Sequence, residues 1–578
     1  MRLLLLLLLF SFVACSQKVT VLPGASLNEP LKPENAYCSN VTVPVDPVTI
    51  TGTANYKKRD LILSGLGSVS AARPIRFAEV AVLDASGNLL NCGETDINGD
   101  ISIDIQRTSA NIYVEVRSRG FNTQVKASIL DTHQNVMYYS LRSSSVVGDN
   151  NRSVGTFTAP ATGTLEGGAF HILDLIYRAN VFLNTTTNNC NITFTNCPPL
   201  SVANKVTVYW KKGFNPATYF GFSANNTVSF YITGTSRLYL VGGVNGDTDN
   251  TDTDHFDDHI ILHEYGHFLE DSHSVSNSPG GAHDGDSLID PRLAWSEGWA
   301  SYFAAQVSGI PIYQDTKGNN SGVTSNLVYY NMETNTSARD PSAGPYVQQD
   351  GEGSFREFAI ARALIDATDL DAGDTDNDGF EGSFNEIWTI FAGSNGFASS
   401  SIFFRFAGKF FSLHDSLAGR TDIKALLDTE RIYDNPNSDF LAHYASPDTG
   451  DGCGAIAITP ANGNTKSEDG SFENSNQFAS NDFYEITHGG GTIDISLNHD
   501  GNQDLDIYLY TSDYLFGNTT YIKAKSDATS GTTENINTSL AAGTYMLNVR
   551  LFPKFNGTTL DTTTANYNLF VDSNRICP

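Results

Sequence analysis

The chain has 578 residues, which is too long for a single hydrophobic core, so three or four domains are expected. Hydrophobic residues make up 40% of the composition, enough for globular folding, whereas charged residues make up only 17%. The formal net charge of −29 argues against the nucleic-acid-binding classes, because an acidic surface cannot release counterions from phosphates. An acidic, polar surface suits a protein outside the cell.

The first residues have the pattern of an export signal. Arg2 precedes an unbroken apolar run over residues 3–10, and small residues lead to Cys15. Such a run is too short to span a bilayer and predicts a signal peptide over 1–15. The end of the run resembles a bacterial lipobox, which implies a lipid on Cys15 and an outer-membrane or cell-surface lipoprotein. A plain signal peptide and a secreted protein are the alternative. Only the lipid anchor would bring the chain to a membrane.

Six cysteines remain after Cys15, and an even number in an exported chain indicates disulfides. Proximity in the sequence predicts three pairs: Cys38–Cys92, Cys190–Cys197 and Cys453–Cys577.

Residues 16–36 are polar, contain three prolines and are expected to form a linker. From 37 to 160, short alternating strands are separated by turn residues, as at 79–83, 101–105 and 112–116. This pattern predicts a β-sandwich domain. The stretch 95–99 resembles the transthyretin-like domains that accompany some peptidases, so a transthyretin- or Ig-like sandwich is expected.

Between 161 and 452 the hydrophobic spacing becomes helical. Helices are predicted over 169–183, 255–270, 291–307, 355–368 and 384–393, and strands over 205–209 and 237–241. The mixture predicts an α+β domain.

From 453 to 578 strands return, at 482–484, 504–510, 542–549 and 567–571. Their order and spacing resemble the bacterial pre-peptidase C-terminal domain, a β-sandwich appended to secreted proteases. A C-terminal β-sandwich is therefore expected.

A cluster of histidines marks the α+β region. Six of the twelve histidines lie between residues 255 and 283, and the cluster contains His263-Glu264-Tyr265-Gly266-His267. Two histidines four residues apart share one face of a helix, so both imidazoles can reach one metal ion. Glu264 would lie beside the open position of the metal as the general base that takes a proton from a water. His255 and His259 are expected to face solvent or to lie behind the ligands.

The sequence leaves two candidates for a third ligand. His273 follows at the spacing found in metzincins, but Glu270 stands where those enzymes turn at a glycine. Glu297 would lie in the middle of a helix that begins at Pro291. An unpaired carboxylate there would be costly, and metal coordination removes that cost.

His263, Glu264, His267 and Glu297 together resemble the gluzincins, the thermolysin-like clan of zinc peptidases. The resemblance implies a zincin-like domain with zinc on His263, His267 and Glu297, and a strand near Val241 that aligns the substrate. Many members orient a zinc-bound histidine with an aspartate four residues after the ligand glutamate, and Ser301 stands there. The clan's oxyanion-stabilising residue has no clear match, which leaves Tyr346, Tyr330 and His283 as candidates.

The resulting hypothesis is an exported bacterial zinc endopeptidase that acts on protein or peptide substrates. The alternative is a surface adhesin or matrix-binding protein that retains an inactive zinc site. Asp374, Asp376 and Asp378 resemble the start of a calcium-binding loop and are a candidate site for Ca²⁺. Asp252 and Asp254 belong to a second acidic run, for which a solvated loop is favoured over calcium.

Overall fold

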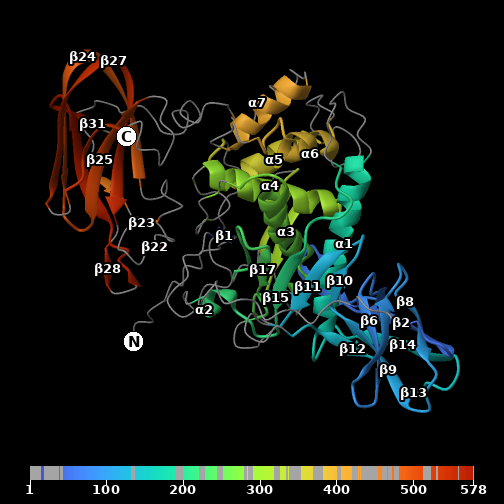
Figure 1. The fold of residues 1–578 in the computed structure, drawn as a ribbon. Helices are drawn as coiled ribbons and strands as arrows, with labels where there is room; N and C mark the ends of the chain where they lie inside the picture. Colours follow the sequence, from blue (N-terminus) through green and yellow to red (C-terminus); the bar gives the residue numbers. More distant parts are fainter. Residues whose placement is uncertain are drawn as a thin grey trace, which may run out of the picture. The chain divides into compact units, whose positions relative to one another are not determined.

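Figure 1 shows the computed structural model of the chain. It describes residues 15–17, 38, 43–131, 137–188, 199–220, 228–243, 251–276, 278, 283, 289, 291–317, 326–333, 336–337, 353–368, 382–399, 405–418, 423, 427, 430, 432, 454–458, 465–466, 472–473, 481–511, 522–528, 531–552, 554–556 and 559–576. Most of the predicted signal peptide and linker lies outside these residues.

Two sheets are built from residues 47–159. One has the order β12–β9–β6–β7 with β13 also paired to β9, and the other has the order β14–β2–β5 with β8 also paired to β2. Their bounds are β2 Pro47–Tyr56, β5 Arg73–Pro74, β6 Glu79–Asp84, β7 Leu89–Glu94, β8 Asp100–Gln106, β9 Asn111–Arg117, β12 Ser140–Arg142, β13 Val146–Val147 and β14 Arg152–Ala159. Burial alternates residue by residue along β8, as the sequence pattern requires. The sandwich-like arrangement predicted for this segment is confirmed.

One predicted disulfide joins the start of this region to β7. Cys38 and Cys92 are bonded, with their Cα atoms 5.8 Å apart. The other predicted pairs, Cys190–Cys197 and Cys453–Cys577, lie outside the described residues.

A six-stranded sheet follows the order β1–β16–β17–β15–β11–β10. Its strands are β1 Cys15–Gln17, β10 Arg119–Phe121, β11 Lys126–Leu130, β15 Val206–Trp210, β16 Phe230–Ile232 and β17 Arg237–Leu240. β10 and β11 come from the segment predicted as an independent sandwich, and β11 pairs in parallel with β15. Residues 127–130 of β11 are all buried, as expected for a strand covered on both faces. The sheet therefore crosses the predicted domain boundary at residue 160.

The position of β17 corrects one expectation. It pairs with β15 on one side and with β16 on the other, so neither of its edges is open. The prediction that the strand near Val241 aligns a substrate backbone is therefore wrong. Hydrophobic spacing identifies a strand but does not reveal its neighbours.

The helices are α1 Glu166–Asn188, α2 Pro216–Tyr219, α3 Asp258–His273, α4 Pro291–Ser308, α5 Glu357–Asp366, α6 Phe384–Ala392 and α7 Ala407–Ala418, with a 3₁₀ turn η1 at Asp254–Phe256. The five predicted helices are confirmed as α1, α3, α4, α5 and α6, whereas α2 and α7 were not predicted. α1 packs against β11, and α3 packs against β16 and β17 (Figure 1). Within the described part of the chain, no helix has the length and apolarity to cross a membrane.

Buried ion pairs connect the N-terminal strands to helices α1 and α3. Lys58 Nζ lies 2.5 Å from Asp258 Oδ1, and His171 Nε2 on α1 lies 2.8 Å from the same oxygen. Arg76 forms an ion pair of 2.7 Å with Asp174 of α1. Removing one partner of such a buried pair leaves an uncompensated charge, so these contacts hold the N-terminal strands to the helices.

Two small sheets lie near the start of α3 and contact one another. The hairpin β3 Arg59–Ile62 and β4 Gly65–Val69 approaches the sheet β18 Ile312–Thr316, β19 Asn326–Asn331 and β20 Thr336–Ser337. Gln314 Nε2 on β18 donates a hydrogen bond of 2.7 Å to the carbonyl of Ile62.

The C-terminal region forms a seven-stranded sheet of order β21–β30–β24–β27–β25–β26, with β31 paired to β30. Its strands are β21 Ile456–Ile458, β24 Asn481–His499, β25 Asp504–Thr511, β26 Ile522–Ser526, β27 Thr533–Phe552, β30 Ala565–Val571 and β31 Asn574–Ile576, and short pairs form from β22 Thr465–Lys466 with β23 Phe472–Glu473 and from β28 Phe555–Asn556 with β29 Thr559–Leu560. Gly490, at φ 92°, lies where the pairing of β24 with β27 skips a residue. The segment is β-rich, as predicted.

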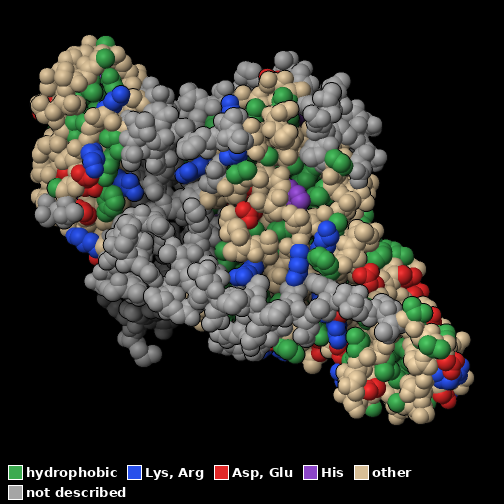
Figure 2. Space-filling model, viewed as in Figure 1, with side chains coloured by type: hydrophobic (Ala, Val, Ile, Leu, Met, Phe, Trp, Pro, Cys, Tyr) green, Lys and Arg blue, Asp and Glu red, His purple; other side chains and the backbone are tan. Residues whose placement is uncertain are grey.

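On the face drawn in Figure 2, acidic side chains are scattered over the N-terminal sheets among Lys and Arg.

Candidate metal centre

Helix α3 carries the His-Glu-Tyr-Gly-His motif. Asp258 lies in its first turn, where the helix dipole favours a carboxylate. Every residue from His259 to Glu270 is buried, so the helix is enclosed on all sides. His263 and His267 lie one turn apart, with their Nε2 atoms separated by 3.1 Å and their rings at 86°.

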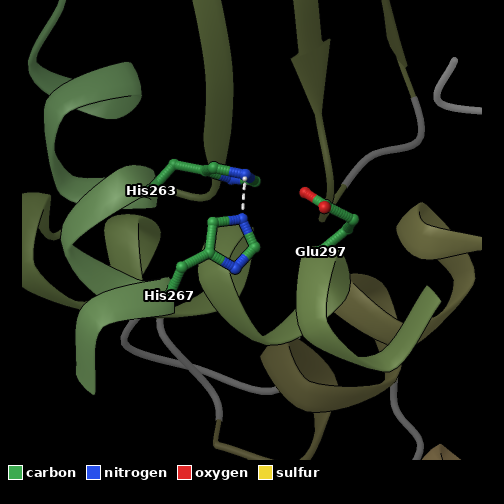
Figure 3. Close-up of side chains that lie close together, drawn as sticks. All are labelled: His263, His267 and Glu297. Carbon is green, nitrogen blue, oxygen red and sulfur yellow. Dashed lines mark hydrogen bonds between the residues drawn. The ribbon is translucent and has the colours of Figure 1, made fainter. Parts of the chain in front are cut away.

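Helix α4 brings Glu297 to these two imidazoles. The fixed φ of Pro291 suits the first turn of the helix. Glu297 has an exposed fraction of 0%, and one ligand atom from each of His263, His267 and Glu297 lies within 4.8 Å of the others. Figure 3 shows the Glu297 carboxylate pointing toward the pair of histidines.

Small residues allow α3 and α4 to approach closely. A Cβ atom built on Gly266 would lie 2.9 Å from the Cα atom of Ala300. Trp299 Nε1 also donates a hydrogen bond of 3.1 Å to the Gly266 carbonyl. Gly266 directly precedes His267, and Ala300 lies three residues after Glu297 on α4. The contact between the two helices therefore sets the separation of the candidate ligands.

The arrangement fits a tetrahedral zinc site. Zinc binds His nitrogen at about 2.0–2.1 Å, which places two such nitrogens about 3.3 Å apart. The observed 3.1 Å between the Nε2 atoms is close to that value. Two imidazoles and one carboxylate leave a fourth position for substrate or water, and a cation would offset the cost of burying an ionised Glu297.

Ser301 fixes the orientation of His263. Its Oγ atom lies 3.1 Å from His263 Nδ1. When Nδ1 donates to this hydroxyl, Nε2 is left with a lone pair for a metal, as ligand histidines require. The serine that departs from the gluzincin pattern thus makes the contact that the pattern assigns to an aspartate.

The alternative third ligand, His273, does not join this group among the described residues. It ends α3 six residues beyond His267, a rise of about 9 Å along the axis. Its ring lies 6.1 Å from that of Trp388, and burial lowers its pKa to about 4.

The candidate oxyanion-stabilising residues differ in position. His283 is buried, and its Nε2 atom lies 3.6 Å from Glu297 Oε2 and 3.1 Å from Glu357 Oε2. Tyr330 on β19 is also buried and pairs across strands with Tyr313. Tyr346 lies outside the described residues.

Sequence reasoning missed two residues near the motif. The ring of Tyr313 lies 5.8 Å from that of His263. Glu357 forms a second group of candidate ligand atoms with His283 and Glu297, and all three side chains are buried. Glu357 begins an amphipathic helix and Tyr313 lies on a short strand. Neither position belongs to a sequence motif that would have indicated a functional residue.

The remaining histidines of the cluster are not exposed to solvent. His255 and His259 have exposed fractions of 2% and 1%, which excludes the first of their two expected positions, facing solvent, and leaves the second, behind the candidate ligands. His255 packs 4.8 Å from the ring of Trp210, and His259 Nε2 lies 3.1 Å from Ser308 Oγ. Glu264, between the two candidate ligands, is likewise buried at 1%.

Two predicted sites are not tested by the described residues. Asp374, Asp376 and Asp378 lie outside them. Cys15 is described only by its backbone, which pairs in β1 with Phe230 of β16.

Comparison with known proteins adds one family match. Residues 185–392 match the family model of the Mycolysin C-terminal domain. The matched segment is just over a third of the chain and contains His263, Glu264, His267 and Glu297. No curated protein matches the chain.

Solved structures are also similar to part of the chain. One of them is the pre-peptidase C-terminal domain of collagenase from Bacillus anthracis, at 18% identity, covering 20% of this chain and 89% of that chain. The TM-score is 0.13, so this likeness carries no argument about fold or function.

Proposed function

We propose that the chain is an exported zinc metalloendopeptidase that hydrolyses peptide bonds. The observation that carries the proposal is the convergence of His263, His267 and Glu297 from helices α3 and α4 on one buried point. The match of the surrounding segment to a Mycolysin domain family supports a peptidase context. The signal-like N-terminus and the Cys38–Cys92 disulfide support export.

His263, His267 and Glu297 would hold the ion, and Ser301 would keep His263 in the tautomer that presents Nε2. A zinc ion held there would supply a Lewis acid that activates water and polarises a carbonyl. Glu264 is next to His263 in the sequence and buried, so it would take the proton of the attacking water and give it to the leaving amine.

His283 is the better of the described candidates for stabilising the oxyanion. Its distance of 3.6 Å from Glu297 Oε2 places its imidazole beside a proposed ligand. Glu357 Oε2 lies 3.1 Å from the same nitrogen, so two carboxylates flank it. A hydrogen bond from this imidazole to a developing negative charge would supply electrostatic stabilisation, which is the largest single contribution to many hydrolytic reactions.

The test is hydrolysis of a quenched fluorescent peptide by the purified chain from residue 16, with zinc quantified in each sample. Glu264→Gln should keep zinc and lose at least about 100-fold in kcat/KM, because only the base is removed. Glu297→Ala should lower zinc affinity. Glu94→Gln, at an exposed position on β7, is the matched control and should leave both unchanged.

Two results would contradict parts of the proposal. Full zinc affinity in Glu297→Ala would return the third-ligand role to His273. A wild-type chain that binds zinc and cleaves neither peptide nor casein would favour the adhesin alternative.

A further inference from the structure

A third group of candidate metal ligands consists of aspartates from segments before and after the metal-binding motif. Asp252 and Asp254 lie immediately before α3, and Asp315 lies on β18. One carboxylate oxygen from each lies within 4.8 Å of the others. Asp315 lies 61 positions after Asp254 in the sequence, so two distant segments bring three carboxylates to one point.

The carboxylates in this group are largely withdrawn from water. Asp254 has an exposed fraction of 3%, and neighbouring Asp257 has one of 0%. Asp254 Oδ2 accepts a hydrogen bond from Ser229, but its Oδ1 atom is buried and has no hydrogen-bond donor. The Oδ1 atom of Asp315 is likewise buried without a donor.

Among the residues that the structure describes, neither Asp254 nor Asp315 forms an ion pair with Lys or Arg. Burial raises the pKa of Asp254 to about 6, and burial together with the charge of Asp254 raises the pKa of Asp315 well above its usual range. Asp257 differs, because it accepts hydrogen bonds of 2.6 Å and 3.0 Å from the Thr316 backbone and hydroxyl.

We propose that Asp252, Asp254 and Asp315 bind a calcium ion. Carboxylate oxygens are the ligands that hard divalent cations prefer, and Ca²⁺ binds them at 2.3–2.6 Å. Two ligands on opposite sides of one Ca²⁺ are therefore up to about 5 Å apart. Three oxygens that all lie within 4.8 Å of one another can thus bind one ion of this size.

Such an ion would join the start of α3 to β18. The 3₁₀ turn η1, which contains Asp254, leads into α3, and β18 follows α4 in the chain. Calcium would thus stabilise the pair of helices that carry the His263–His267–Glu297 group, while touching none of those residues. The inference concerns a different site from the proposed zinc centre and does not depend on peptidase activity.

The test uses the full chain from residue 16, stripped of metals and reloaded with one equivalent of Zn²⁺. Ca²⁺ is titrated in chelator-free buffer while thermal unfolding is recorded. At a Ca²⁺ concentration about 100 times Kd, the wild type should gain roughly 5–10 °C in Tm. Asp254→Asn and Asp315→Asn should lose most of this gain. Asp60→Asn, whose carboxylate is exposed and paired with Arg73, is the matched control and should keep it.

The Tm measured without calcium distinguishes a variant that has lost the calcium site from one that folds poorly. In calcium-free buffer, Asp254→Asn should unfold at or above the wild-type temperature, because the substitution removes a buried like charge. The proposal is overturned if Ca²⁺ leaves the wild-type Tm unchanged, or if both Asn variants keep the full gain. Peptide hydrolysis, measured on the same samples, tests the proposed function separately.

Discussion

The closest approach between the two ligand-bearing helices makes Gly266→Ala an informative substitution. The added Cβ atom would lie 2.9 Å from Ala300 Cα and 3.3 Å from both the Cβ and the carbonyl oxygen of Ala300. Carbon atoms prefer separations of about 3.5–4.0 Å, so the helices must move apart by at least about 0.6 Å. Two of the three close atoms belong to the backbone, and rotation of a side chain cannot relieve the contact.

The expected effect on stability is smaller than the effect on metal binding. Alanine gains about 1 kcal/mol of helix propensity over glycine, whereas overpacking costs about 1–3 kcal/mol, so the unfolding free energy should fall by at most about 2 kcal/mol. Metal sites tolerate ligand displacements of about 0.2 Å, which is less than the predicted shift. We therefore expect zinc affinity to fall about 10- to 100-fold.

Zinc affinity would be measured by competition with a chromophoric chelator, and stability by thermal unfolding of the same samples. Gly489→Ala is the control, because no atom lies within 4 Å of its added Cβ. Unchanged zinc affinity in Gly266→Ala would refute the reasoning that this contact sets the ligand separation.

Three further predictions follow from particular contacts. Ser301→Ala removes the 3.1 Å contact with His263 Nδ1 and should weaken zinc binding about tenfold in the same competition assay, while Ser301→Asp should retain it. Lys58→Met removes the 2.5 Å ion pair of half-buried Asp258, which keeps Arg178 at 3.8 Å, and should cost about 1–3 kcal/mol in urea unfolding. A loss under about 0.5 kcal/mol would contradict the role of the ion pair. Burial, reinforced by Asp504, raises the pKa of Asp506 on β25 to about 8. The folded C-terminal region therefore holds a proton that the unfolded chain releases above about pH 4, so its stability should fall as pH rises from 4 to 8, and Asp506→Asn should flatten this dependence in thermal unfolding.

The first two candidate ligands were predictable because they lie on one helix. His263 and His267 are four residues apart, and the helical period alone brings them to one face. Glu297 was predictable for a different reason, since Pro291 identified the helix start and placed a costly carboxylate in its interior. The structure groups these three residues, while assignment of a metal to them remains a proposal.

The sequence pattern could not predict which residues from distant segments join the candidate sites. Glu357 and Asp315 come close to their partners only through packing of α5 and β18, and no local spacing records such contacts. For His255 and His259 the sequence left two positions open, facing solvent or behind the ligands. The choice between them depends on α1, β16, β17 and β18, which pack around α3 and are not evident from local spacing.

The sheet order was the least predictable part of the fold. The strand predicted over 205–209 is confirmed as β15, but its pairing with β11 depends on tertiary contacts. The covered edge of β17 and the transfer of β11 to the central sheet both follow from such pairing.

The parallel pairing of β11 with β15 determines where the chain can be shortened. A truncated chain that began at residue 161 would lose β10 and β11 and leave one edge of β15 with unpaired backbone groups. Exposed edges of this kind template the addition of strands from other molecules. Such a truncated protein should aggregate. A chain that begins before β2 keeps β11 paired with β15 and should remain monodisperse. The segment that resembles a separable N-terminal module is therefore a part of the folding unit that any recombinant form must retain.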